Sequence, residues 1–105
     1  MAFVMFQYDR PTDTHHWAEY NRHVRDWINA LLMIPGASSF MAYRTADGAS
    51  PNTTTMLEFH SLDEARKATT SEQMKGVLQS FRAVGAYPTV LVVERSPFTP
   101  EPIRV

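Results

Sequence analysis

The amino-acid sequence predicts a single α+β domain whose elements follow the order β-α-β-β-α-β. Three observations support this: four short segments rich in β-branched and aromatic residues, two longer segments with helical periodicity, and proline, glycine or polar breaks between them. A chain of 105 residues has the usual size of one domain. We expect the domain to span residues 1–96 and residues 97–105 to form an extended, proline-rich tail.

The N-terminal part is predicted to form a strand followed by a long helix. Residues 3–8 combine aromatic and β-branched side chains, and Pro11 stops strand pairing. A polar residue at positions 12–14 can cap the helix, which we expect from about residue 14 to about residue 33. Its apolar residues recur three and four positions apart and form one stripe, widened by Trp27: Trp17, Tyr20, Val24, Ile28 and Leu31.

The middle of the chain is predicted to form a turn, a hairpin and a second helix start. Ile34-Pro35-Gly36 ends the first helix, because proline cannot continue it and glycine permits a sharp turn. Residues 38–45 and 53–60 are strands joined by a short polar loop, which is typical of a β-hairpin. The segment from Ser61 to Glu64 has the pattern of a capping box, in which the serine binds the third amide and the glutamate reaches back.

The C-terminal part is predicted to form a helix and a last strand. The second helix runs from residue 62 to about residue 84. Its periodicity weakens at residues 69–71, where Ser71 offers a second cap that can divide it. Residues 88–95 form the last strand, and residues 90–93 contain no polar side chain. Two β-α-β halves on one antiparallel sheet make a ferredoxin-like sandwich.

The predicted sheet is apolar on both faces, although helices can cover only one of them. Phe3 and Met5, or their neighbours, must lie on the uncovered face, as must half of residues 90–93. A large apolar face needs a second cover, and a second copy of the chain supplies it most simply. We therefore expect a homodimer joined through the open sheet face into an α/β barrel; the alternative is a monomer with an exposed apolar sheet.

Composition excludes several classes of function. The formal net charge is −1 and no basic run occurs, so no nucleic-acid-binding surface is expected. The chain has no cysteine, which excludes disulfides, thiolate metal sites and cysteine nucleophiles. The longest apolar run, residues 30–35, is too short to span a bilayer, and no signal peptide is recognisable. We expect a cytoplasmic protein without a membrane partner.

The four histidines do not have the spacing of a metal site. They are His15, His16, His23 and His60, and no two of them are four residues apart. His16 and His23 lie two helical turns apart, about 10 Å, which is too far for one zinc ion. His23 borders the apolar stripe of the first helix. It is either a boundary histidine or a proton acceptor at a pocket mouth, because histidine titrates near neutral pH.

Aromatic and hydroxyl-bearing residues form a second candidate set. If the sheet and the first helix part to leave a cleft, six side chains can line a flat aromatic ligand: Phe6, Tyr8, Tyr20, Trp27, Thr53 and Thr55. The alternative is that these residues only pack the core, which is the usual role of aromatic residues at helical spacing. Arg10, after the first strand, is either a solvated turn residue or a partner for a ligand carboxylate.

The sequence resembles the dimeric α/β-barrel superfamily, and most nearly its EthD-like members. The resemblance rests on residues 8–13, on Trp17 and Tyr20, on Ile34-Pro35-Gly36, and on residues 59–65 at the junction of a strand and a helix. It covers nearly the whole chain. It implies two ferredoxin-like sheets that pack face to face in a homodimer.

The resemblance also implies a class of chemistry. Cofactor-free enzymes of this superfamily use pocket tyrosine and histidine residues to polarise a phenol or ketone, which implies His23 as base and Tyr20 or Tyr43 as hydrogen-bond donor. EthD-like members have a histidine followed by proline midway along the first helix, and this chain has only the nearby His23. Haem-degrading members have an axial histidine on the second helix. Residues 62–84 contain none, so no haem or other cofactor is expected.

Two functions follow as hypotheses. The first is a small biosynthetic protein, similar in size to accessory proteins of polyketide and prodiginine pigment pathways, that binds an aromatic or polyketide-like intermediate. It would act as a cofactor-independent monooxygenase, cyclase or isomerase. The second is a non-catalytic accessory module of such a pathway, which the absence of a strong acid–base pair in the sequence favours. A cavity with histidine or tyrosine side chains pointing inward would favour the first hypothesis.

Overall fold

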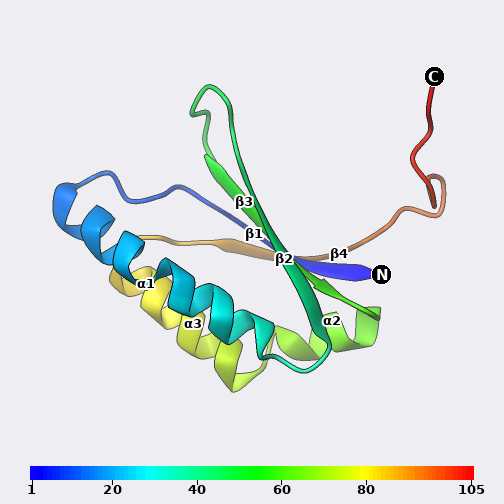
Figure 1. The fold of residues 1–105 in the computed structure, drawn as a ribbon, viewed down its shortest axis with the longest axis horizontal. Coiled ribbons are helices and arrows are strands. Elements are labelled where there is room, and N and C mark those ends of the chain that lie inside the picture. The colour runs from blue at the N-terminus through cyan, green and yellow to red at the C-terminus, as the bar shows by residue number, and fades with distance from the viewer.

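A computed structural model describes all 105 residues and has a four-stranded antiparallel sheet with its helices on one face (Figure 1). The strand order is β2-β3-β1-β4. The predicted order of elements and the ferredoxin-like sandwich are confirmed, with the second helix divided in two. The elements are β1 (Ala2–Tyr8), α1 (Thr14–Leu32), β2 (Ala37–Arg44), β3 (Thr53–Phe59), α2 (Leu62–Ala68), α3 (Glu72–Ala83) and β4 (Thr89–Glu94).

The core lies between the sheet and the helices. β1 alternates strictly, so that every second side chain from Ala2 to Tyr8 is buried toward the helices. The register pairs Val4 with Leu57 of β3 and with Val92 of β4, which places all three on the inner face. The apolar stripes of α1 and α3 pack against this face. One contiguous core of 17 buried residues therefore holds the two layers together.

Polar side chains cap the three helices. Asp13, Ser61 and Ser71 each accept a hydrogen bond from the backbone N–H three residues further on, at 3.0 to 3.2 Å. The division that Ser71 predicts is confirmed, because α3 begins directly after it. The capping box differs in one detail: the Glu64 carboxylate accepts a hydrogen bond from the Ser61 hydroxyl at 3.1 Å rather than from its backbone N–H.

Ile34-Pro35-Gly36 connects α1 to the edge strand β2. Gly36 has φ of +88°, a conformation that L side chains rarely adopt. A Cβ at this position would collide with the Glu64 carboxylate of α2. The turn therefore packs against the start of α2 at a place where only glycine fits.

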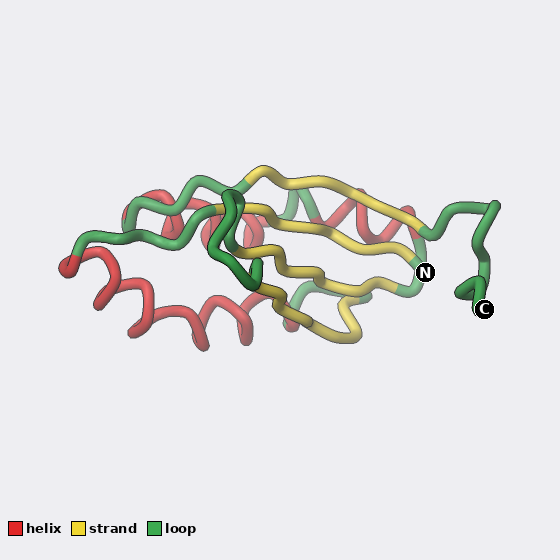
Figure 2. The backbone as a smooth tube through the Cα atoms, turned by 90° about the horizontal axis from the view of Figure 1, so that it is seen from above, coloured by secondary structure: helices red, strands yellow, loops and turns green.

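The outer face of the sheet has no helix over it (Figure 1). Figure 2 shows its four strands side by side. Met41 on β2 and Leu91 on β4 are 56% and 41% exposed. The strand register places six large apolar side chains on this face: Phe3, Met5, Met41, Met56, Leu91 and Val93. The predicted two-sided apolar character of the sheet is thus present in the fold.

The chain forms no helix or strand after β4 ends at Glu94. Three hydrogen bonds fold this segment locally: Arg95 Nη1 donates to the Pro100 carbonyl oxygen at 2.9 Å, and the Phe98 and Thr99 backbone N–H groups donate to Ser96 Oγ and to the Ser96 carbonyl oxygen at 3.2 and 3.0 Å. Phe98 and Ile103 are almost fully exposed, and the segment leads away from α1 and α3 (Figure 1). No helix of the structure has the length and apolar character needed to cross a bilayer.

Candidate functional site

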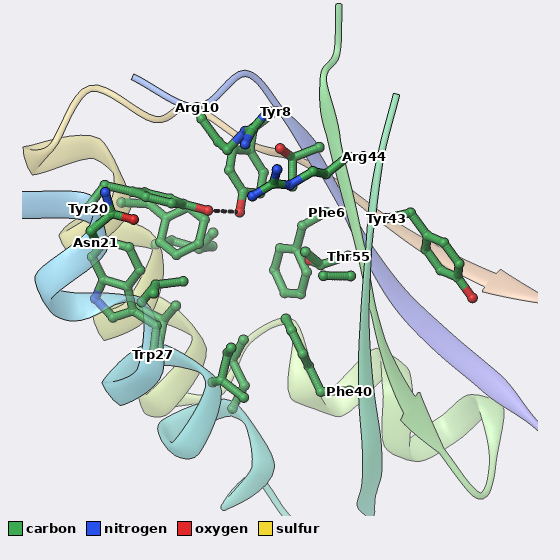
Figure 3. A pocket seen from close by; sticks show the side chains of 18 of the residues that line it. Phe6, Tyr8, Arg10, Tyr20, Asn21, Trp27, Phe40, Tyr43, Arg44 and Thr55 are labelled. Carbon is green, nitrogen blue, oxygen red and sulfur yellow. Dashed lines mark hydrogen bonds between the residues drawn. The ribbon is translucent and has the colours of Figure 1, made fainter. Parts of the chain in front are cut away.

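A cavity of about 210 Å³ lies between α1, α3 and the inner face of the sheet (Figure 3). Nineteen residues line it, and fourteen of them are hydrophobic. The sheet presents small side chains beneath α1, namely Ala42, Thr53 and Thr55. These do not fill the space under the helix, so a partly open, mostly apolar pocket remains.

Aromatic rings that contact one another form the helical side of the cavity. The ring of Tyr20 stacks on that of Trp17 with centroids 5.9 Å apart, and it meets Trp27 edge to face at 5.6 Å. Trp27 in turn lies 4.5 Å from Phe81 of α3. Each ring restricts its neighbours, so the aromatic side chains on this side of the cavity are held in place without a ligand.

Two tyrosine hydroxyls meet at one end of the cavity. Tyr8 Oη and Tyr20 Oη are 2.6 Å apart, and both side chains are buried. Burial raises the pKa of both hydroxyls above that of a free tyrosine; their mutual hydrogen bond raises the pKa of Tyr8 further. The hydrogen bond and the charges of Arg10 and Arg44 act in the opposite direction on Tyr20 without cancelling the effect of burial. Both tyrosines therefore remain neutral at physiological pH and act as hydrogen-bond donors.

Arg10 and Arg44 lie at the same end of the cavity as this tyrosine pair (Figure 3). Arg10 follows β1 and donates from its backbone N–H and from Nε to Asn52 Oδ1, at 3.1 and 3.4 Å. The Thr53 hydroxyl donates to the same oxygen at 3.0 Å. Asn52 thereby ties the loop after β1 to the start of β3 and fixes the direction of the Arg10 side chain.

The five predicted ligand-binding residues all line the cavity: Phe6, Tyr8, Trp27, Thr53 and Thr55. Tyr20, one of the three predicted catalytic residues, also lines it and points inward (Figure 3). The alternation of β1 and β3 and the periodicity of α1 explain this convergence, since they place these residues on the inner faces of their elements.

The other two predicted catalytic residues lie elsewhere. His23 does not line the cavity; its Nε2 lies 3.5 Å from the Glu19 carboxylate, and its side chain is 40% exposed. Tyr43 adjoins the cavity on β2, but its ring points away from it (Figure 3) and is 55% exposed. Within one chain, the structure does not bring His23, Tyr20 and Tyr43 together. The reason is that His23 is on the flank of α1, and Tyr43 is on the outer face of β2.

Two polar lining residues were not identified from the sequence. Asn21 follows Tyr20 on α1, and Arg44 ends β2 with its side chain on the inner face. Neither has a motif around it. β2 has apolar residues on both faces, so alternation did not indicate that Arg44 faces inward.

No side chain that lines the cavity could serve as a strong base, and the lining residues include no set of metal ligands. No histidine, aspartate, glutamate or lysine is among its lining residues. No group of three or more histidine, aspartate or glutamate side chains elsewhere in the chain has metal-binding geometry. The cavity can therefore bind a ligand through apolar contact, donate hydrogen bonds and present positive charge.

Comparison with solved structures shows a fold shared with three groups of proteins. An EthD-family protein from Bacillus halodurans superposes with a TM-score of 0.69 and 16% identity, over 91% of this chain and 99% of that one. The cofactor-independent oxygenase SnoaB from Streptomyces nogalater (a mutant) gives 0.68 and 14%, over 95% and 97%. An antibiotic biosynthesis monooxygenase gives 0.62 and 12%, over 92% and 100%.

These comparisons confirm the resemblance that the sequence suggested, at the level of fold. Identities of 12% to 16% show a common ferredoxin-like architecture and no more. No protein-family description matches the sequence, and no similar sequence is found among curated proteins. The function of the cavity therefore has to be inferred from the residues that line it.

Proposed function

We propose that the chain is a small biosynthetic protein that binds a flat aromatic or polyketide-like intermediate in the cavity beneath α1. The observation on which the proposal depends is the aromatic cavity of about 210 Å³ with a buried tyrosine pair at one end. The similarity in fold to a cofactor-independent oxygenase and an antibiotic biosynthesis monooxygenase supports it.

The lining residues suggest how such a ligand would lie. Trp27 and Phe81 offer ring faces and edges against which a planar molecule stacks. One hydroxyl of the Tyr8–Tyr20 pair donates to the other, and the remaining proton is free to donate to a phenol or carbonyl oxygen of the ligand. A carbonyl polarised in this way is easier to enolise, which is the step shared by cofactor-free oxygenation, cyclisation and isomerisation.

The second candidate function is a non-catalytic accessory module that binds the intermediate without converting it. One observation favours it: no histidine or carboxylate lines the cavity, so no side chain there can remove a proton at neutral pH. In the catalytic alternative the ligand must therefore enter already ionised, or His23 must reach it after a movement of α1.

Isothermal titration with 1-naphthol, a planar phenol, tests the binding proposal. We expect saturable binding to one site per chain. Val24→Phe places a larger side chain in the cavity and should abolish binding, because Val24 lines it. Ala18→Phe on the exposed side of the same helix is the matched control and should bind as the wild type does. Equal affinity in all three proteins would exclude the cavity as the binding site.

Mass spectrometry of the ligand that co-purifies distinguishes the two candidates. If the protein is an oxygenase, incubation of the complex in air converts a methylene of the ligand to a carbonyl: one atom of O₂ enters the ligand, and the other leaves as water with the two methylene hydrogens. A cyclase or isomerase changes its retention or ultraviolet spectrum instead. An accessory module returns the ligand unchanged in all three measurements.

We also propose that the protein works as a homodimer through the outer face of the sheet. The six large apolar side chains on that face would otherwise remain in contact with water. An isologous pairing of two such faces buries them against each other.

A further inference from the structure

We propose that Arg10 and Arg44 form a guanidinium pair that binds a carboxylate of the aromatic ligand at the tyrosine end of the cavity. This inference rests on the proposed function and narrows it, since it makes the ligand an aromatic acid. Four properties of this end of the cavity support it: the position of both arginines, the absence of a counter-charge, the fixed orientation of Arg10, and the apolar character of the remaining cavity.

Both guanidinium groups lie close to the tyrosine pair. Each belongs to a residue that lines the cavity, and Figure 3 shows both side chains beside the hydroxyls of Tyr8 and Tyr20. Both positive charges act to lower the pKa of Tyr20, although burial raises it overall. An anionic oxygen at this end would therefore have two cations and one free hydroxyl donor around it, because the other hydroxyl donates within the Tyr8–Tyr20 pair.

Neither arginine has an anionic partner within the chain. The four ion pairs of the structure involve other residues, and no aspartate or glutamate lines the cavity. The nearest carboxylate in sequence, Asp9, instead accepts hydrogen bonds from the Ser50 hydroxyl and the Asn52 backbone N–H. Two like charges at the mouth of an apolar cavity repel each other, and a bound anion relieves that repulsion.

Arg10 is held in place before any ligand arrives. Asn52 Oδ1 accepts from its backbone N–H and from Nε, which leaves the two terminal nitrogens free to donate. Arg10 also lies over the ring of Trp17, with the guanidinium carbon 5.9 Å from the ring centroid. A planar guanidinium whose outer nitrogens are free matches the two oxygens of a carboxylate.

The rest of the cavity specifies what the carboxylate must be attached to. Beyond the arginines, the tyrosine pair, Asn21, two threonines and Tyr43, whose ring points away from the cavity, every lining side chain is predominantly apolar. A small hydrophilic acid would leave this surface without contact, whereas an aromatic acid fills it. The ligand class is therefore a hydroxylated aromatic or polyketide-derived carboxylate.

The test compares two probes that differ only in charge, 1-hydroxy-2-naphthoate and 1-hydroxy-2-naphthamide, by isothermal titration. We expect Arg10→Gln and Arg44→Gln each to weaken naphthoate binding by at least about tenfold, because each removes a charge-assisted hydrogen bond. Binding of the neutral amide should change by less than about twofold in the same variants. Arg25→Gln, which removes the same charge from an exposed site on α1 outside the cavity, is the control.

A second variant tests the pair without removing an arginine. Asn52→Asp supplies a carboxylate to Arg10 from within the chain, so it should compete with the ligand and weaken naphthoate binding while the amide binds as before. The amide also reports whether each variant is folded.

The outcomes separate this inference from the proposed function. If the amide and 1-naphthol bind and the arginine variants affect naphthoate no more than amide, the guanidinium pair is refuted while the aromatic site stands. If no naphthalene probe binds the wild type, both proposals are refuted. A loss in Arg25→Gln as large as in Arg44→Gln would show a general charge effect and would also refute the pair.

Discussion

Gly36 is the residue at which backbone conformation and packing restrict the sequence most. Its φ of +88° strains any L side chain, and a Cβ there would displace the Glu64 carboxylate from the Ser61 hydroxyl. We expect Gly36→Ala to lower the free energy of unfolding by about 2 kcal/mol, of which about 1 kcal/mol is conformational and about 1 kcal/mol is the lost hydrogen bond. Urea denaturation followed by circular dichroism measures this loss.

Gly48 provides the matched control for that prediction. Its φ of +79° imposes a similar conformational strain, but a Cβ there would have no atom within 4 Å. Gly48→Ala should therefore cost only the conformational part, about 1 kcal/mol. Equal losses in the two variants would show that the contact with α2 contributes nothing to stability.

The sequence predicted many of the residues that line the cavity, but at the charged end it did not predict Arg44. Tyr8, Thr53 and Thr55 could be predicted because each lies on a strand with clear alternation between faces. Tyr43 and Arg44 could not be assigned to faces in this way, because β2 has apolar residues on both sides. A register shift between Ala37 and Ser39 makes the assignment depend on the folded sheet.

The start of α1 illustrates how one side chain stabilises an element. Asp13 accepts hydrogen bonds from the His16 backbone N–H at 3.0 Å and from His16 Nδ1 at 2.8 Å. These two bonds, the backbone one first, hold the pKa of Asp13 below its usual value. No other acidic residue lies in the first turn of α1. The helix that forms one side of the cavity therefore depends on this carboxylate at its N-terminus.

The pKa of Asp13 predicts a pH dependence of stability. Because the folded-state pKa is lower than the unfolded one, about 3.9, ionised Asp13 stabilises the fold above that pH. The contribution is lost as the pH falls through the folded-state pKa. We expect Asp13→Ala to melt at a lower temperature than the wild type at pH 7, and the difference to shrink at pH 3. Thermal melting followed by circular dichroism at pH 7, 5, 4 and 3 measures this trend.

Asp13→Asn is the control for the titration. Asparagine is a comparable N-cap but has no charge to lose, so its difference from Asp13→Ala should stay nearly constant over the same pH range. A wild-type advantage over Asp13→Ala that does not change between pH 7 and pH 3 would contradict the prediction.

For the helices, polar capping residues predicted the boundaries, whereas helical periodicity did not predict which borderline side chains face the cavity. The boundary between α2 and α3 was predictable because Ser71 is a good N-cap within a stretch of poor helix formers. The position of His23 was not, since it lies three residues from Tyr20 and four from Trp27, where a small rotation of α1 decides between cavity and solvent. The rotation is set by Trp27 against Phe81, a contact between helices far apart in sequence.

The outer face of the sheet is the surface that most needs a partner, because its large apolar side chains have no cover within one chain. Leu91 lies on this face opposite Met5, and it is 41% exposed in the single chain. In the proposed dimer a lysine at position 91 would be buried without a counter-charge, at a cost of several kcal/mol. In a monomer the same lysine would be solvated and harmless.

Leu91→Lys should therefore convert the protein from dimer to monomer without unfolding it. Multi-angle light scattering at micromolar concentration should give twice 12.0 kDa for the wild type and 12.0 kDa for the variant. Met33→Lys introduces the same charge at the end of α1, where the side chain is 76% exposed and off the sheet, and should remain dimeric. A wild-type mass of 12.0 kDa would refute the dimer. A dimeric Leu91→Lys variant would place the interface elsewhere, because two sheet faces cannot close over unpaired lysines.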